Sequence, residues 1–198
     1  MGRPRTFEPD DALGRIKDAF WRSGYDGTSL EEIEAATGLR KQSLYRLFGD
    51  KKGMYLAALE HYGSHEIAAA VALLSAGGSA AERFAGLLSA VVADAAAGRE
   101  RLGCFLAFAT VERAQRDADT ARAVERLVAT LRAAFEDALA ASPPFDKDAS
   151  LRSRTAARLL AGFFGLKVLL KANADAETLG EAVAGMLETI AAARPAGA

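Results

Sequence analysis

Three short helical segments separated by glycine-containing turns occupy residues 10–50, and they limit the possible folds of this chain more than any other feature. The first segment begins at Asp10 or Asp11, either of which can accept hydrogen bonds from the free amides of a first helical turn. Apolar residues then recur at i, i+3 and i+7, the spacing of one helix face: Leu13, Ile16 and Phe20. We expect Gly24 to end this helix as a left-handed cap.

Two more short helices and a long one follow. Thr28 is suited to cap the second helix, Glu31 three residues later completes a capping box, and Gly38 ends the helix. The third helix ends at Phe48, and Asp50 caps the long fourth helix. A glycine-containing turn between the second and third of three short helices predicts a helix-turn-helix. The alternative is a generic three-helix subdomain with solvated charges.

Positive charge is concentrated in residues 38–59, although the formal net charge of the chain is −1. This segment contains one acid, Asp50, and five cations: Arg40, Lys41, Arg46, Lys51 and Lys52. A nearly neutral chain is not expected to coat nucleic acid, but a local basic patch can bind DNA phosphates.

The third helix separates apolar from polar residues. At about 100° per residue, Leu44, Leu47 and Phe48 share one face, which we expect to point inward. The opposite side carries Gln42 and Arg46, flanked by Ser43 and Tyr45. These donor-rich side chains suit base edges and phosphates, and the helix contains no acid. The pattern therefore favours DNA recognition.

The rest of the chain also predicts helices, so the fold class is all-α, with about nine helices in 198 residues. We place a helix-turn-helix DNA-binding domain at residues 1–55 and a helical ligand-binding and dimerisation domain at residues 56–198. Helix breaks are expected at Gly77-Gly78, Gly98, Asp117–Asp119, Pro143-Pro144 and Asn173. No membrane-spanning stretch is present, and the single cysteine suits a reducing cytoplasm.

Residues 19–59 closely resemble the N-terminal domain of the TetR family of bacterial transcriptional regulators. The resemblance rests on several residues at the family's spacing: Gly24-Tyr25, Thr28-Ser29, Ile33, Gly38, Leu44-Tyr45, Phe48 and Lys51. It implies a homodimer whose third helices enter successive major grooves of a palindromic DNA operator. It also implies a repressor released by an unknown small-molecule effector, although activation stays open.

The resemblance also assigns roles to individual residues. Thr28, Ser29, Tyr45 and Lys51 match positions that hold phosphates or lie beside them, while the base-reading region is matched by Arg40, Lys41, Gln42, Ser43 and Arg46. The chain departs from the family at Arg40 and Gln42, where long side chains can hydrogen-bond guanine and adenine. A third departure, Glu34, is expected to affect helix packing. Arg3 and Arg5 can reach a minor groove or phosphates, or can serve solubility alone.

Apolar residues of the second domain can line an effector cavity, although each is also suited to an ordinary core. The tentative ligand-binding set is Phe84, Leu88, Phe105, Phe108, Leu127, Leu131 and Phe163. The last two helices, about 151–171 and 175–193, are expected to pair with their copies in a four-helix bundle. Ala161, Gly162 and Gly165 would permit close helix approach there; burial within one chain is the alternative.

Other chemistry is weakly represented. Cys104 is either a reactive, sensing thiol, activated by Arg99 and Arg101, or a buried structural residue. His61 and His65 lie at i, i+4, but no second cluster of Cys or His completes a metal site, so we assign neither metal nor cofactor. No catalytic motif is present, and we predict no enzyme. The competing class is a helical carrier of small molecules that does not bind DNA.

Overall fold

The computed structural model describes residues 9–96 and 102–193, and all regular secondary structure in this part of the chain is helical. Ten α-helices and two π-helical turns form nine continuous helical segments within these residues. The predicted all-α class is therefore confirmed. No helix in the described ranges combines the length and apolar character needed to cross a membrane.

The chain divides into two compact units that do not follow a single cut in the sequence. Unit 1 comprises Met1–His65 and Phe105–Glu125, and unit 2 comprises Glu66–Cys104 and Arg126–Ala198. A segment from the middle of the chain thus belongs to the same unit as the N-terminal helices. The functional boundary between residues 55 and 56 stays a prediction.

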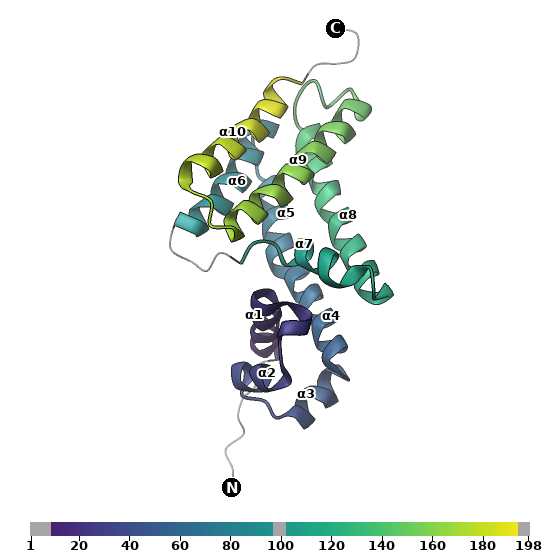
Figure 1. Ribbon diagram of the computed structural model, residues 1–198. Helices are drawn as coiled ribbons and strands as arrows, with labels where there is room; N and C mark the ends of the chain where they lie inside the picture. Colours follow the sequence, from purple (N-terminus) through teal and green to yellow (C-terminus); the bar gives the residue numbers. More distant parts are fainter. Residues whose placement is uncertain (1–8, 97–101, 194–198) are drawn as a thin grey trace. The chain divides into compact units, whose positions relative to one another are not determined.

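Unit 1 contains the predicted helix-turn-helix. Its helices are α1 (Pro9–Gly27), α2 (Leu30–Thr37), α3 (Lys41–Phe48), α4 (Lys51–Tyr62) and α7 (Phe105–Ala109). The π-helical turn η2 (Thr110–Ala114) follows α7, and a second, η1 (Gly63–Ile67), follows α4 at the end of the unit. Helix α1 packs against α2 and α4, and α3 packs against α4 (Figure 1).

Two local details of these helices differ from the sequence expectations. The capping box of α2 is formed by Ser29 and Glu32, one residue later than predicted for Thr28 and Glu31. Gly24 interrupts α1 at φ 74° and ψ 178°, a positive-φ conformation whose ψ differs from that of the left-handed cap that was expected. Glycine is favoured here because a positive φ of this kind is strained for residues with a Cβ, and a Cβ would also lie 2.6 Å from Oε1 of Glu112.

Aromatic side chains form the core of unit 1. The Tyr55 ring makes edge contacts with Phe20, Tyr25 and Phe105, at centroid distances of 5.1, 5.1 and 5.5 Å. Phe105 lies on α7, so the middle segment of the chain supplies part of the core of the N-terminal helices. Each such ring pair stabilises the fold by about 0.5–1.5 kcal/mol in addition to the hydrophobic gain from the area that the rings remove from water.

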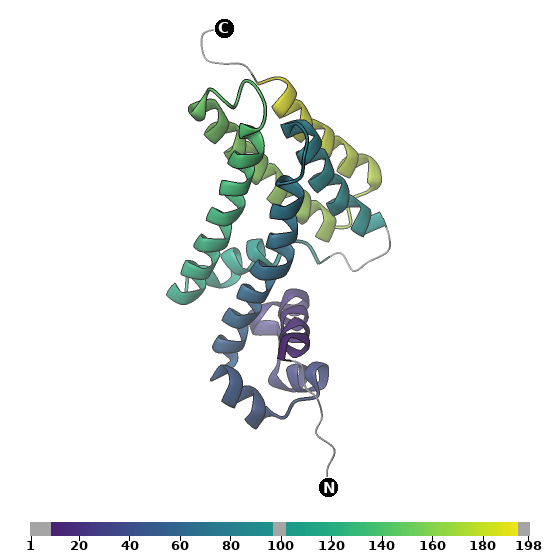
Figure 2. The same cartoon turned by 180° about the vertical axis from the view of Figure 1, so that it is seen from behind.

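Unit 2 contains α5 (Ala68–Leu74), α6 (Ala80–Ala96), most of α8 (Ala118–Ala140), α9 (Ala149–Lys171) and α10 (Ala176–Ala191). Helices α6, α9 and α10 pack against one another and lie side by side in both views (Figure 2). The breaks predicted at Gly77-Gly78, Asp117–Asp119, Pro143-Pro144 and Asn173 all fall at helix ends. The break predicted at Gly98, like Arg3, Arg5, Arg99 and Arg101, lies outside the described residues.

Candidate nucleic-acid interface

The start of α3 is fixed by a carboxylate from α2. Arg40 is the N-cap of α3, but its side chain makes no capping hydrogen bond. Instead, the backbone N–H of Lys41 donates to Oε1 of Glu34, at 2.6 Å. Gly38, at φ 73°, ends α2 in the left-handed conformation and lets the chain turn into α3, as predicted. Glu34 therefore positions α3, a more specific role than the helix packing expected from the sequence.

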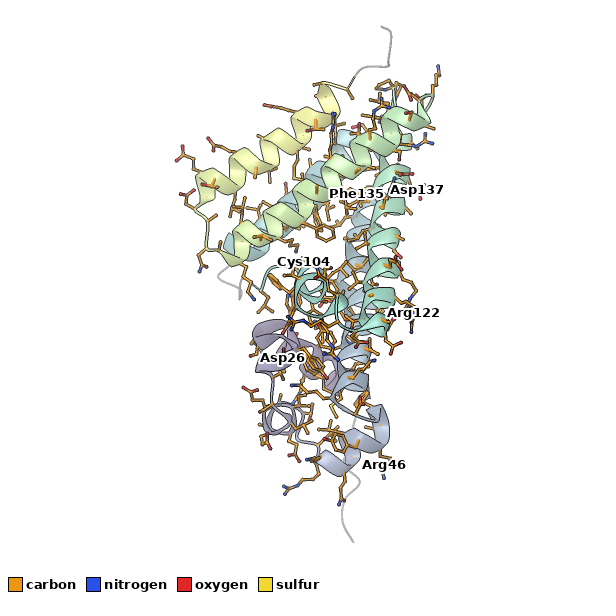
Figure 3. All side chains as sticks on the ribbon, turned by 45° about the vertical axis from the view of Figure 1, so that its right-hand side comes forward. Asp26, Arg46, Cys104, Arg122, Phe135 and Asp137 are labelled. Carbon is orange, nitrogen blue, oxygen red and sulfur yellow. The ribbon has the colours of Figure 1, made fainter. Side chains whose placement is uncertain are left out.

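The polar face of α3 is exposed. Arg40, Lys41, Gln42 and Arg46 are exposed, and Ser43 is half-buried. The Arg46 side chain projects away from the helix (Figure 3). We call these residues the α3 face: Arg40, Lys41, Gln42, Ser43, Tyr45 and Arg46. Its two guanidinium groups and its ammonium only donate, whereas its amide and two hydroxyls both donate and accept, so the set can bind both phosphates and base edges.

One of the three residues of this helix that were predicted to point inward is exposed. Leu44 is fully buried and Phe48 is half-buried, but Leu47 is 49% exposed. Tyr45 is 37% exposed, and the Lys41 ammonium lies 5.4 Å from the centroid of its ring. The eight-residue helix thus holds to its unit mainly through one leucine, and its exposed surface is wider than its sequence pattern predicted.

The hydroxyls of Thr28 and Ser29 have partners within the chain. Thr28 is 1% exposed, and its hydroxyl donates to the backbone oxygen of Gly24 at 2.7 Å. The Ser29 hydroxyl accepts from the backbone N–H of Glu32, whose carboxylate accepts the Ser29 N–H in return. Their phosphate contacts stay predictions. Ser29 is exposed at a helix start, where free amides favour an anion, whereas Thr28 fixes the preceding turn.

The two lysines at the start of α4 have different surroundings. The Lys51 ammonium lies 4.7 Å from the centroid of the Tyr25 ring. Lys52 instead forms ion pairs with Asp117, at 2.8 Å, and Asp119, at 2.6 Å. Hydrogen bonding to these carboxylates raises the pKa of Lys52, and the same contact lowers the pKa of Asp117 to about 2. Lys52 is therefore neutralised within the protein.

The turn η2 and the residues after it form further polar contacts with α1. The guanidinium carbon of Arg113 lies 3.6 Å from the centroid of the Tyr25 ring, and Arg113 also pairs with Asp117 at 3.2 Å. Glu112 accepts the backbone N–H of Asp26 at 3.3 Å. The sequence alone does not predict this network, because its partners are about 60–90 residues apart and no local pattern joins them.

The tentative ligand-binding residues fall in both units. Phe84, Leu88, Leu127, Leu131 and Phe163 are buried in unit 2. There the Phe135 ring joins two helices to α8, with edge contacts to Phe84 at 5.0 Å and Phe163 at 5.8 Å. Phe105 and Phe108 belong to unit 1, where Phe105 is part of the aromatic core. Cys104 is buried, 1% exposed, as expected of a structural cysteine.

Helices α9 and α10 each expose a row of small residues. Ala161, Gly165 and Val168, at i, i+4 and i+7, are exposed on α9, and Gly180 and Ala184 are exposed on α10. A Cβ at Gly165 or Gly180 would meet nothing within 4 Å. Gly162, in contrast, faces α10, where a Cβ would lie 3.1 Å from Cγ of Met186.

Known proteins resemble this chain in sequence and in fold. Residues 16–58 match the family model described as bacterial regulatory proteins, tetR family. YezE of Bacillus subtilis, an uncharacterized HTH-type transcriptional regulator, is 30% identical over 135 residues, covering 68% of this chain and 70% of that protein. ComR of Escherichia coli, an HTH-type transcriptional repressor, is 41% identical over 61 residues, covering 31% and 29%.

A solved structure extends the similarity over nearly the whole chain. It contains a cysteine mutant of CifR, a TetR family transcriptional regulator, complexed with 26-base-pair double-strand operator DNA. The TM-score is 0.80 at 29% sequence identity, and the match covers 94% of this chain and 98% of that one.

Proposed function

Because this chain belongs to the TetR family of DNA-binding transcriptional regulators, we propose that it is a repressor whose homodimer binds a palindromic operator and is released by a small molecule. Family members are regulators and not enzymes. The observation that carries the proposal is the exposed, acid-free α3 face, fixed at its start by Glu34. Repression is supported by the similarity to ComR, a transcriptional repressor, and operator binding by the similarity to CifR in complex with operator DNA.

Most of the α3 face reads bases, while its Tyr45 and residues around the face hold phosphates. Arg40 and Arg46 can each donate two hydrogen bonds to guanine, and Gln42 can pair with adenine in the same two-bond manner. Tyr45, Lys51 and the amides near Ser29 are the phosphate contacts in this proposal. Lys51 is suited to this role because, unlike Lys52, it is not paired with a carboxylate in the contacts described above.

The homodimer forms through α9 and α10. Their exposed small residues, Ala161 and Gly165 on α9 and Gly180 and Ala184 on α10, support close packing of four helices. A palindromic operator requires such a two-fold dimer, because each half-site is read by one α3. The protein acts in the cytoplasm, where bacterial DNA lies.

The effector binds in unit 2 among the buried aromatic residues of α6, α8 and α9. Its effect on DNA binding passes through the segment from α7 to the start of α8, which contributes Phe105, Glu112 and Asp117 to unit 1. An effector that shifts this segment changes contacts to Tyr55 and Lys52 on α4 and to Asp26 beside α2. The two sites are then coupled by a shift in the population of two conformations.

The test is selection of binding sites from random double-stranded DNA with the purified full-length protein. We expect an enriched palindrome whose affinity falls steeply with salt concentration. Gln42→Ala should relax the preference at particular base pairs, at about 1–3 kcal/mol each, without changing the salt dependence. Lys51→Ala should reduce the slope of log affinity against log salt by about 1 and leave the sequence preference intact.

Absence of any salt-sensitive specific complex would reject the proposal and favour the small-molecule carrier. An enriched site without two-fold symmetry would reject only the dimer arrangement. Measuring transcription from a promoter that contains the selected site, with and without the protein, then separates repression from activation.

A further inference from the structure

Two histidines and an aspartate from different helices meet in unit 1. Nε2 of His61 lies 3.4 Å from Oδ1 of Asp10, and Nε2 of His65 lies 3.7 Å from Oδ2 of the same carboxylate. The potential ligand atoms of the three residues all lie within 4.8 Å of one another. The two imidazole rings are stacked, with centroids 3.9 Å apart and planes 15° from parallel, so their Nε2 atoms face one carboxylate together.

The π-helical turn brings this cluster together. His61 lies in the last turn of α4 and His65 in η1, where the wider helical turn holds the second ring over the first. Asp10 lies in the first turn of α1, and Gly14, one turn later, leaves the space beside the His61 ring open. A Cβ at Gly14 would be 3.7 Å from Cε1 of that ring, so a longer side chain would cover it.

The hydrogen bond at the other nitrogen of His65 sets the chemistry of this cluster. Nδ1 of His65 lies 2.9 Å from the backbone oxygen of His61. A carbonyl oxygen only accepts, so Nδ1 must carry the proton. In the neutral ring Nε2 is then a lone-pair donor aimed at a carboxylate oxygen, which also carries lone pairs. Either a proton or a metal cation must lie between them.

We propose that Asp10, His61 and His65 bind a divalent transition-metal cation of the zinc class, with a fourth position left to water. Zinc bonds of about 2.0–2.1 Å at tetrahedral angles place ligand atoms about 3.3 Å apart, close to the two observed N–O distances. Because the two rings are stacked nearly parallel, one imidazole must turn on binding so that both Nε2 lone pairs point at the cation. Imidazole nitrogens favour zinc, nickel or copper over magnesium or calcium. The Nδ1–H bond to a carbonyl is the usual outer support of a metal-binding histidine.

Such a cation would connect the first turn of α1 to the end of α4. His65 is the last residue of the N-terminal part of unit 1, immediately before the chain enters unit 2. The histidine pair alone does not predict a metal site, because Asp10 is about 50 residues away in the sequence and its position there indicates a helix cap. The site does not depend on the proposed repressor function.

The experiment is a Zn²⁺ titration of the metal-free, full-length protein in competition with a chromophoric chelator. We expect one Zn²⁺ per chain, and His65→Ala and Asp10→Asn should each lower the affinity at least about tenfold, the smallest loss typical of even an outer partner. Asp11→Asn, a change to an exposed carboxylate beside Asp10, is the matched control and should leave the affinity unchanged. Cys104→Ser should also leave it unchanged.

Two further measurements keep the result specific. Co²⁺ bound in place of Zn²⁺ should give the visible absorption of a tetrahedral complex, and this absorption should disappear in His65→Ala. Far-ultraviolet circular dichroism must show unchanged helix content in each variant. The chain has only two histidines, so wild-type affinity in His65→Ala would overturn the proposal. Equal losses of Zn²⁺ affinity in Asp10→Asn and Asp11→Asn would also overturn it, and so would the absence of Zn²⁺ binding at micromolar concentration. The contact of Asp10 with the two histidines would then be a simple ion pair.

Discussion

The α3 face and the start of α4 are both rich in cations, yet their charges have different partners. On the α3 face Arg40, Gln42 and Arg46 are exposed to solvent. At the start of α4 the Lys52 ammonium lies between the carboxylates of Asp117 and Asp119. One basic segment of the sequence therefore divides into a surface available to an external anion and a contact that holds unit 1 together.

The number of cations in a segment of the sequence therefore overestimates how many of them are available to bind a ligand. All five cations of residues 38–59 count equally in the sequence, but the carboxylates that pair with Lys52 come from residues far along the chain. The α3 face and the Lys52 network can therefore be tested separately, one by DNA affinity and the other by stability.

The largest expected effect is on stability. Lys52→Met removes the ammonium and leaves Asp117, whose side chain is 7% exposed, with Arg113 as its remaining cation, so the free energy of unfolding should fall more than in any other variant described below. Trp21, the single tryptophan, belongs to unit 1, so its fluorescence in a urea titration reports this unit. Lys51→Met is the control, with an expected loss of about 0.5–1 kcal/mol. Equal losses in the two variants would show that the ion pairs of Lys52 stabilise unit 1 no more than the contact of Lys51 with Tyr25 does.

The next effect is on DNA affinity. Arg46→Ala should weaken binding to the selected operator by about 1–3 kcal/mol, as expected for one base-contacting arginine, and change unfolding by no more than about 0.5 kcal/mol. A mobility-shift titration measures the first quantity and urea unfolding the second. Arg132→Ala, at an exposed arginine on α8, should leave operator affinity unchanged. If both arginine variants lost the same affinity, the α3 face would not be the reader.

A smaller effect is expected at the start of α3. Glu34→Ala removes the acceptor of the Lys41 N–H and should cost about 1 kcal/mol, the usual value for a lost helix cap. Amide hydrogen exchange at Lys41 should become faster, while Glu34→Gln, which keeps an acceptor oxygen, should restore much of the protection. Unchanged exchange at Lys41 in Glu34→Ala would contradict the capping role.

The smallest effect should appear in acid. The native pKa of Asp117, about 2, lies below the value of about 3.9 expected in the unfolded chain, so its ionised form stabilises the fold. That contribution is complete above about pH 5 and is lost progressively as the pH falls toward 2. Trp21 fluorescence should show that Asp117→Asn loses less stability than wild type over this interval. Identical losses would assign the acid sensitivity to other groups.

Much of the fold could be predicted because its signals are local. Gly38 and Asp50 end and begin helices by backbone rules that need only a few neighbouring residues, and both predictions are confirmed. Thr28 failed as a cap because two adjacent hydroxyl residues fit the same rule, and packing decided between them. The burial of Thr28 against Ala19 and Gly24 left Ser29 at the helix start.

The site was predictable to the extent that it lies on one helix. The exposure of Gln42 and Arg46 followed from helical periodicity. The exposure of Leu47 did not, because the inner surface available to so short a helix is narrow. The pairing of Lys52 with Asp117 and the meeting of Asp10 with two histidines depend on tertiary contacts. No periodicity or spacing in a single sequence contains that information.

The bond from Glu34 to the first amide of α3 has a consequence for re-engineering the specificity of this regulator. A chimera that grafts only residues 41–48 from a relative would keep Glu34 but change the surroundings of the N–H that donates to it. A graft into a chain with alanine at the corresponding position would lose the bond altogether. The transferable module is therefore α2 together with α3, and residue 34 must be exchanged together with the base-reading residues of α3.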